Sequence, residues 1–129
     1  MLNLHSPFRR AVAEDMDTIR ALLGERSGPA PAEAVVADEG GEITAVLDGR
    51  PDGGAWRVDA LAVFHERVGE LGPRVLRLAD ALAAEDGLAS VVLEPASLDP
   101  EMRALLEEEG FRPKPGAAGL MERPVIPQG

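Results

Sequence analysis

The chain has 129 residues, 45% of them hydrophobic, and its 23 acidic against 13 basic residues give a formal net charge of −10 at pH 7. A chain of this length can bury one substantial core, so we expect a single domain over residues 1–129. The negative charge disfavours nucleic acid or an anionic membrane as a partner, because both are bound mainly through basic patches. The same charge is compatible with ligands that carry an amine.

Several classes of site are excluded by the residue types present. The sequence has no cysteine, so disulfides, thiolate zinc sites and a cysteine nucleophile are ruled out. Neither His5 nor His65 belongs to a close cluster with carboxylates, and we expect no metal. No serine occupies a Gly-x-Ser-x-Gly turn, which removes the common hydrolase pattern. No apolar run approaches the roughly 20 residues that span a bilayer, and no signal peptide is recognisable, so we expect a cytoplasmic protein.

The first part of the chain predicts a strand, a helix and a hairpin. Residues 8–12 favour a strand, and the apolar positions that follow Asp15 keep helical spacing up to Leu23. Residues 24–34 are dense in glycine and proline and predict a loop. The runs 34–37 and 42–47 flank a Gly-Gly turn and predict a hairpin, whose second arm is expected to end in the loop 48–54.

The centre of the chain predicts a strand, a turn and an amphipathic helix. Residues 55–64 form the most apolar strand and show no clean alternation, which favours burial on both faces. Gly72 and Pro73 predict the start of a helix, because proline is tolerated at the first helical position. Gly87 predicts its end. A short strand at 89–93 follows, and this order predicts a parallel crossover.

The last part of the chain predicts a helix from Leu98 or Asp99 through Glu109, ended by Gly110, and a closing strand over 118–125. Three segments in this order resemble the GNAT superfamily of acyl-CoA-dependent N-acyltransferases: FRRAVAEDMDTIRALL, VDALAVFHERVGELGPRVLRLADALAAEDGL and LEEEGFRPKPGAAGLMERPV. The resemblance implies a mixed α/β (α+β) fold with a mostly antiparallel twisted sheet of six to seven strands and helices on both faces, in the order β-α-β-β-β-α-β-α-β.

The resemblance also implies an acetyl-CoA site around the central strand and turn. Edge groups of Leu61, Ala62 and Val63 are expected to pair with the pantetheine amides. The diphosphate is expected at the segment that follows, which comprises Arg67, Val68, Gly69, Glu70, Leu71 and Gly72, because backbone amides at a helix start favour anions. The acceptor is expected to be a primary amine of a small molecule or a protein.

Two carboxylates are candidates for catalysis. Asp59 occupies a position on the central strand where members of the superfamily often carry an acid, and it is the first candidate for the base that deprotonates the amine. An exposed ion pair is the structural alternative for this residue. Glu94 follows the strand 89–93 and is the second candidate. The tyrosine that many members use as an acid is missing, because Leu106 stands in its place and the chain has no tyrosine.

A second hypothesis belongs to another class of protein. Glu70 stands where the superfamily motif has glycine, and Pro73 lacks an N–H, so the domain could be a degenerate relative without CoA binding or catalysis. It would then act as an assembly or regulatory module, with a homodimer as its expected form.

Overall fold

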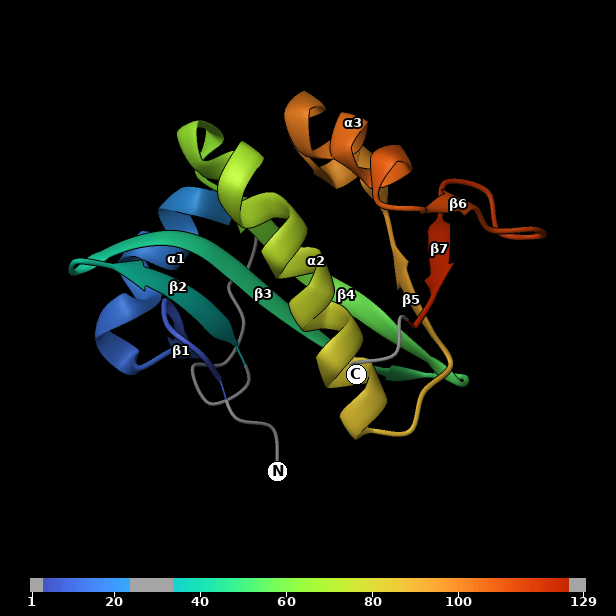
Figure 1. Ribbon diagram of the computed structural model, residues 1–129, viewed down its shortest axis with the longest axis horizontal. Coiled ribbons are helices and arrows are strands. Elements are labelled where there is room, and N and C mark those ends of the chain that lie inside the picture. Colours follow the sequence, from blue (N-terminus) through green and yellow to red (C-terminus); the bar gives the residue numbers. More distant parts are fainter. Residues whose placement is uncertain (1–3, 24–33, 126–129) are drawn as a thin grey trace.

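The computed structural model describes residues 4–23 and 34–125 (Figure 1). Its strands and helices, in chain order, are β1 (Phe8–Arg10), α1 (Met16–Leu23), β2 (Val35–Glu39), β3 (Glu42–Asp52), β4 (Ala55–Val63), α2 (Val68–Glu85), β5 (Ser90–Leu93), α3 (Pro100–Glu108), β6 (Arg112–Pro113) and β7 (Met121–Pro124). Single 3-10 turns precede the three helices, at Ala13–Asp15, His65–Arg67 and Pro95–Ser97.

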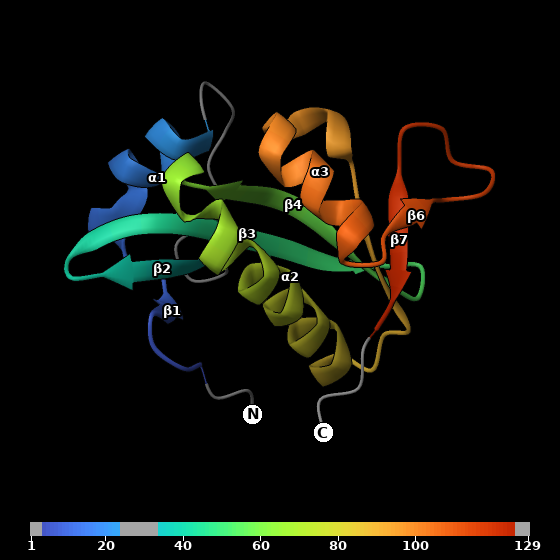
Figure 2. The same ribbon diagram turned by 45° about the horizontal axis from the view of Figure 1, so that its top comes forward.

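The strands form one seven-stranded sheet in the order β1-β2-β3-β4-β5-β7-β6. All neighbouring strands are antiparallel except β4 and β5, which are parallel and joined through α2. Helix α1 lies on one face of the sheet, and α2 and α3 lie on the other (Figures 1 and 2). The expected fold class, a mostly antiparallel sheet with helices on both faces, is therefore confirmed.

Several boundaries differ from the sequence-based expectation. The second hairpin arm does not end at residue 47, because β3 continues to Asp52 and turns into β4 at Gly53 and Gly54, which both have positive φ. Helix α2 begins at Val68 rather than at Gly72, so Pro73 lies inside the helix. The strand β6 was not expected, β1 ends at Arg10, and β7 is shorter than predicted. Apart from Ala34, the predicted loop 24–34 lies outside the described residues.

The core has two parts, one on each face of the sheet. On the α2 side the buried side chains include Phe111, Leu71, Leu76 and Leu106, which join α2, α3 and the sheet. On the α1 side the core is smaller and includes Ile19. The central strand β4 contributes to both, as its lack of alternation predicted.

The lack of alternation in β4 has a second cause, which is a β-bulge at Asp59. Asp48 of β3 is opposite Ala60 and Gly49 is opposite Val58, so the backbone of Asp59 has no residue opposite it on β3. An extra residue on one strand reverses which face the following side chains point to. Val58 and Leu61 therefore both pack on the α2 side although they are three residues apart.

Gly49 is required opposite this bulge. A Cβ at this position would lie 2.5 Å from the carbonyl oxygen of Arg57 and 2.6 Å from the ring of Trp56. The indole ring is buried and covers the glycine. Neither the strand backbone nor a packed indole can move aside at low cost.

We expect Gly49→Ala to lower the free energy of unfolding by about 2 kcal/mol or more, because overpacking forces the ring or the strand to shift. Urea unfolding followed by circular dichroism measures this change. Gly69→Ala is the matched control, since a Cβ there meets no atom within 4 Å and is expected to be neutral or slightly stabilising. Equal effects of the two substitutions would contradict the role assigned to Gly49.

A buried ion pair fastens the C-terminal strand to α2. Arg123 of β7 and Asp80 of α2 are 3% and 0% exposed, and Nη2 of the arginine lies 2.6 Å from Oδ2 of the aspartate. The guanidinium also donates to the carbonyl oxygens of Leu76 and Glu109 and lies 4.6 Å from the ring centroid of Phe111. One side chain thus joins α2, the end of α3 and β7.

We expect Arg123→Met to destabilise the protein by about 3 to 5 kcal/mol, because it leaves the Asp80 carboxylate buried without its cation. Thermal unfolding monitors the loss. Arg20→Met, which removes an exposed pair with Asp17 at 3.7 Å, is the control and is expected to cost less than about 1 kcal/mol. A small change in Tm for Arg123→Met would contradict this account.

Candidate functional site

The candidate site is the gap where β4 and β5 separate. The two strands pair only through Ala55, Trp56 and Arg57 on β4 and Ser90 to Val92 on β5. The bulge at Asp59 comes two residues after Arg57, the last residue of β4 that pairs with β5, and a bulge bends the strand that carries it. A hollow of about 120 Å³ lies beyond the paired region and is lined by Arg57, Val58, Asp59, Ala60, Leu61, Leu93, Glu94 and Leu98.

The edge of β4 that faces this gap carries backbone groups that pair with none of the described strands. The N–H of Phe64 donates to the carbonyl of Thr44 on β3, at 2.8 Å. Because backbone groups alternate between the two edges of a strand, those of Leu61 and Val63 point away from β3 and toward β5. The pairing between β4 and β5 ends at Arg57 and Val92, before Leu61 and Val63 are reached. An extended ligand that carries amide groups can pair with this edge in the manner of an added strand.

The two candidate catalytic carboxylates are brought to the same hollow. Asp59 enters it from the bulge of β4, and Glu94 from the residue after β5. The Asp59 side chain is 38% exposed, and its Oδ2 accepts from Nε of Arg50 at 3.1 Å. Glu94 is exposed. Neither side chain is enclosed, and the ion pair foreseen as the alternative for Asp59 is present.

The start of α2 lies at the other end of the same edge. One 3-10 turn, His65–Arg67, connects β4 to the helix, and the N–H of Val68 donates back to the carbonyl of His65. The first helical amides have no partner within the helix itself. Pro73 is the sixth residue of α2, so its missing N–H does not affect this first turn.

Arg67 is held in place by two carboxylates. Its Nε and Nη2 donate to the two oxygens of Glu39 at 2.8 and 2.7 Å, and Nη1 lies 2.9 Å from Oε2 of Glu70. The Glu39 carboxylate also accepts from the Thr44 hydroxyl at 2.7 Å. Arg67 first, and Thr44 second, hold the pKa of Glu39 below its ordinary value. The guanidinium therefore ties α2 to the β2–β3 hairpin.

The Glu70 side chain is 76% exposed. An acid in the first turn of a helix interacts favourably with the helix dipole, and Glu70 has this position together with its ion pair to Arg67. Leu106, at the place of the absent tyrosine, is fully buried in the core and does not reach the gap.

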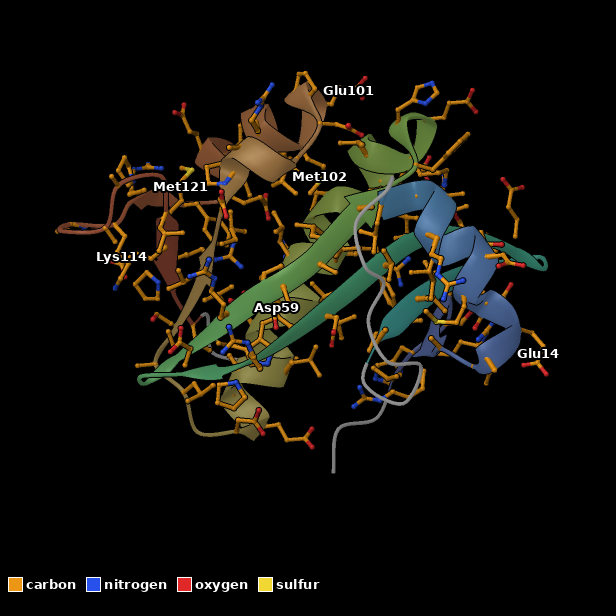
Figure 3. All side chains as sticks on the ribbon, turned by 180° about the vertical axis from the view of Figure 1, so that it is seen from behind. Glu14, Asp59, Glu101, Met102, Lys114 and Met121 are labelled. Atoms are coloured by element: carbon orange, nitrogen blue, oxygen red, sulfur yellow. The ribbon has the colours of Figure 1, made fainter. Side chains whose placement is uncertain are left out.

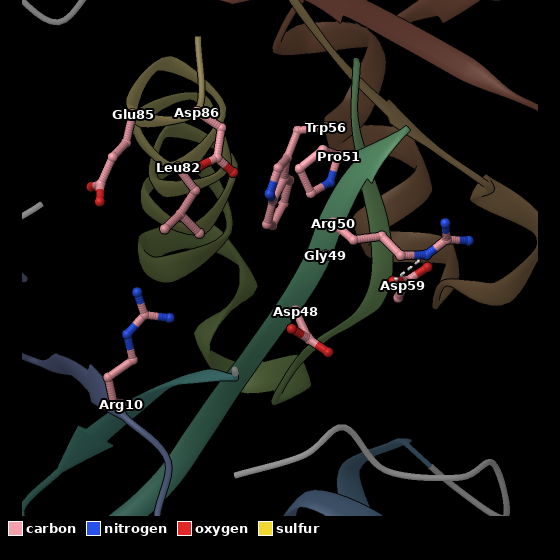
Figure 4. Close-up of a pocket in the computed structure, with 10 residues that line it drawn as sticks. All are labelled: Arg10, Asp48, Gly49, Arg50, Pro51, Trp56, Asp59, Leu82, Glu85 and Asp86. Atoms are coloured by element: carbon pink, nitrogen blue, oxygen red, sulfur yellow. Dashed lines mark hydrogen bonds and ion pairs between the residues drawn. The ribbon is translucent and has the colours of Figure 1, made fainter. Parts of the chain in front are cut away.

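A larger hollow of about 520 Å³ lies beside β3, past the point where β2 begins (Figure 4). Trp56 and Leu82 form apolar walls, and the rim carries charged residues that include Arg10, Glu85 and Asp86. Asp59 borders this hollow as well as the smaller one. We place the candidate chemistry in the smaller hollow, because only there do the open β4 edge and both candidate carboxylates meet.

Sequence reasoning missed three residues of this region. Glu39, the partner of Arg67, comes from a distant hairpin and has no local signal. Arg57 and Gly49 were passed over as part of a strand and a loop. The three-residue step between Val58 and Leu61 was the available sign of the bulge, since an unbroken strand would have kept a step of two.

Residues 4–23 and 34–125 contain no group of three or more His, Cys, Asp or Glu side chains placed to hold a metal ion. In the same part of the chain, no helix is both long and apolar enough to cross a membrane.

Comparison with known proteins gives no match by sequence and many by structure. No family model and no curated protein matches the sequence. Ard1 from Thermoplasma volcanium superposes with a TM-score of 0.72 at 16% identity, over 93% of this chain and 97% of that one. The ribosomal-protein-S18-alanine N-acetyltransferase from Escherichia coli gives 0.66 at 14%, over 95% of each chain.

A third similar structure contains a ligand. The N-acetylglutamate synthase from Neisseria gonorrhoeae, in complex with coenzyme A and N-acetyl-glutamate, has a TM-score of 0.66 at 13% identity, over 98% of this chain and 36% of that one. The chain described here has the GNAT acetyltransferase fold, as its sequence segments suggested.

The carboxylate of Glu39 on β2, paired with Arg67 just before α2, makes stability depend on pH. Because the pKa of Glu39 is lowered in the folded protein, its stabilising effect is complete above the ordinary glutamate pKa of about 4.3 and is lost as the pH falls below it. We expect Glu39→Gln to lose roughly 1 kcal/mol at pH 7 and to lose less further stability than the parent between pH 5 and 3.

Urea unfolding at a series of pH values measures both quantities. Glu66→Gln serves as the control, since Glu66 is 71% exposed and lies 3.9 Å from His65. Parallel stability curves for the parent and Glu39→Gln would contradict the ion-pair account.

Proposed function

We propose that this protein is an N-acetyltransferase that transfers the acetyl group of acetyl-CoA to a primary amine of a small molecule or a protein. The observation that carries the proposal is the open β4 edge beside a hollow that holds Asp59 and Glu94. The GNAT fold supports it, as does the coenzyme A bound to the N-acetylglutamate synthase of similar structure.

The reaction forms a C–N bond and breaks the C–S bond of the thioester, which supplies an activated acyl group. The amine must lose a proton, and the departing thiolate must gain one. We assign the first task to Asp59, with Glu94 as the second candidate, acting directly or through water. Arg50 holds the Asp59 carboxylate beside the hollow. The described residues offer no tyrosine to protonate the thiolate.

The cofactor is proposed to lie along the open edge of β4, paired with the backbone groups of Leu61 and Val63, with its acyl end at the hollow and its diphosphate at the start of α2. The backbone groups of Ala62, which were also expected to pair with it, point to β3 instead. There the segment from Arg67 to Gly72 presents backbone amides, and we assign diphosphate binding to those amides. Arg67 is assigned a positioning role, since Glu39 and Glu70 already engage its guanidinium.

A second candidate function is favoured by the same cluster. Glu39, Arg67 and Glu70 together carry one positive and two negative charges, which leaves a net charge of −1 beside the proposed diphosphate site. A domain with this cluster and no CoA binding would act as an assembly module, with a second copy of the chain as its partner. Sedimentation that shows only a monomer would contradict this candidate.

Titration with acetyl-CoA by calorimetry decides between the two candidates. We expect binding by the parent protein and about three- to tenfold tighter binding by Glu70→Gln at low ionic strength, because one negative charge near the diphosphate is removed. Glu85→Gln makes the same change of charge at the other end of α2 and is the control. If millimolar acetyl-CoA produces no heat and no thermal shift, the acetyltransferase is ruled out and the assembly module remains.

A further inference from the structure

Arg57 differs from every other arginine in the described part of the chain. Its side chain is partly buried, yet it takes part in no hydrogen bond, ion pair or ring contact, whereas the other partly or fully buried arginines, Arg9, Arg67 and Arg123, all have partners. A partly buried cation without an anion is costly. The chain has a net charge of −10, and Asp59 and Glu94 line the same hollow as Arg57, so the absence of an ion pair between Arg57 and either carboxylate calls for an explanation.

The neighbours of Arg57 on the sheet add to this cost. Arg57 is directly opposite Arg50 on β3, and like charges in this position destabilise a sheet. Arg50 has its own carboxylate, Asp59. On the other side Arg57 is opposite Val92 of β5, which in turn is opposite Glu122 of β7. The Glu122 carboxylate forms an ion pair with Lys114 at 3.3 Å. Arg57 thus lies between two satisfied ion pairs.

Arg57 also separates two hollows. The smaller one holds Asp59 and Glu94, and is the proposed site of amine chemistry. The other, of about 250 Å³, is lined by Asp52, Gly53, Ala55, Arg57, Val92, Lys114 and Leu120. Asp59 and Lys114 are both seen from the side of the sheet that carries α1, in a region that this helix does not cover (Figure 3).

We propose that Arg57 binds a carboxylate of the acceptor, so that the acceptor is an amino acid, with its amine directed toward Asp59 and Glu94. This inference rests on the proposed acetyltransferase function. Guanidinium and carboxylate groups match in geometry and form strong charge-assisted hydrogen bonds. Asp52 borders the second hollow, and Lys114 is already paired with Glu122. The site therefore suits a singly charged carboxylate better than a doubly charged phosphate.

Binding of matched ligand pairs tests the proposal without turnover. The probes are leucine and 3-methylbutylamine, lysine and 1,5-diaminopentane, and phenylalanine and 2-phenylethylamine, which differ only in the carboxylate. Ligand-detected NMR measures each affinity on the intact protein in the presence of coenzyme A. We expect at least one amino acid to bind about tenfold or more tightly than its amine.

The variant Arg57→Gln is expected to remove this preference and leave the affinity for the three amines unchanged or slightly higher. Arg103→Gln, an exposed position on α3, makes the same change of net charge and is expected to keep the preference. Thermal unfolding serves as a second measurement. Because Arg57→Gln removes a like-charge pair with Arg50, its Tm without ligand should not fall, and the amino acid that raises the parent's Tm should no longer do so.

No preference for any amino acid over its amine, or a preference that survives Arg57→Gln, would overturn the inference. Tighter binding of O-phosphoethanolamine than of all three amino acids would also overturn it, in favour of a phosphate. A titration of the same samples with acetyl-CoA tests the acetyltransferase function separately from the amino acid acceptor. If acetyl-CoA binds and no carboxylate preference exists, the acetyltransferase stands and the amino acid acceptor falls. If the preference exists without acetyl-CoA binding, Arg57 still binds a carboxylate, but the acetyltransferase falls and with it the role of the amino acid as acceptor.

Discussion

The bulge at Asp59 is the constraint on which the site depends. One extra residue in β4 moves the side chains of Leu61 and Val63 to the same face as Val58, and thereby places them in the core with α2. It also comes where β4 leaves β5, so the edge beyond it stays open. Gly49 permits this geometry because any side chain there would meet the Trp56 ring. Core packing and site shape therefore have one cause.

Two networks of charge fix the elements around that strand. Arg67 joins the start of α2 to the β2–β3 hairpin through Glu39, and Arg123 joins the other half of the sheet to α2 through Asp80. The first network is partly exposed and contributes modestly, whereas the second is buried and is expensive to break. Both hold α2 against the sheet, one at each side of the gap between β4 and β5.

On the face beside α1 the charges are arranged differently. Arg50 and Lys114 each have a carboxylate, and Arg57 between them has none. The carboxylates of Asp59 and Glu94 lie at one side of Arg57 and the hollow bordered by Lys114 at the other. An acceptor with an amine and a carboxylate complements this arrangement, and a simple amine uses only half of it. A simple amine would leave the Arg57 guanidinium without an anion, and the free-energy cost of that unpaired charge favours an amino acid over the amine.

The sequence by itself determined the order of the elements, the hairpin at Gly40 and Gly41 and the central apolar strand, because these follow from local periodicity and turn residues. It indicated the fold class through its resemblance to the GNAT superfamily. It also indicated Asp59 and Glu94, which the structure brings to one hollow. Only the tertiary structure decided where α2 begins, that Asp59 forms the bulge, and that Glu39 engages Arg67 while Arg57 has no partner. These depend on contacts between residues that are distant in sequence or on different strands, and no local pattern of residues records such contacts.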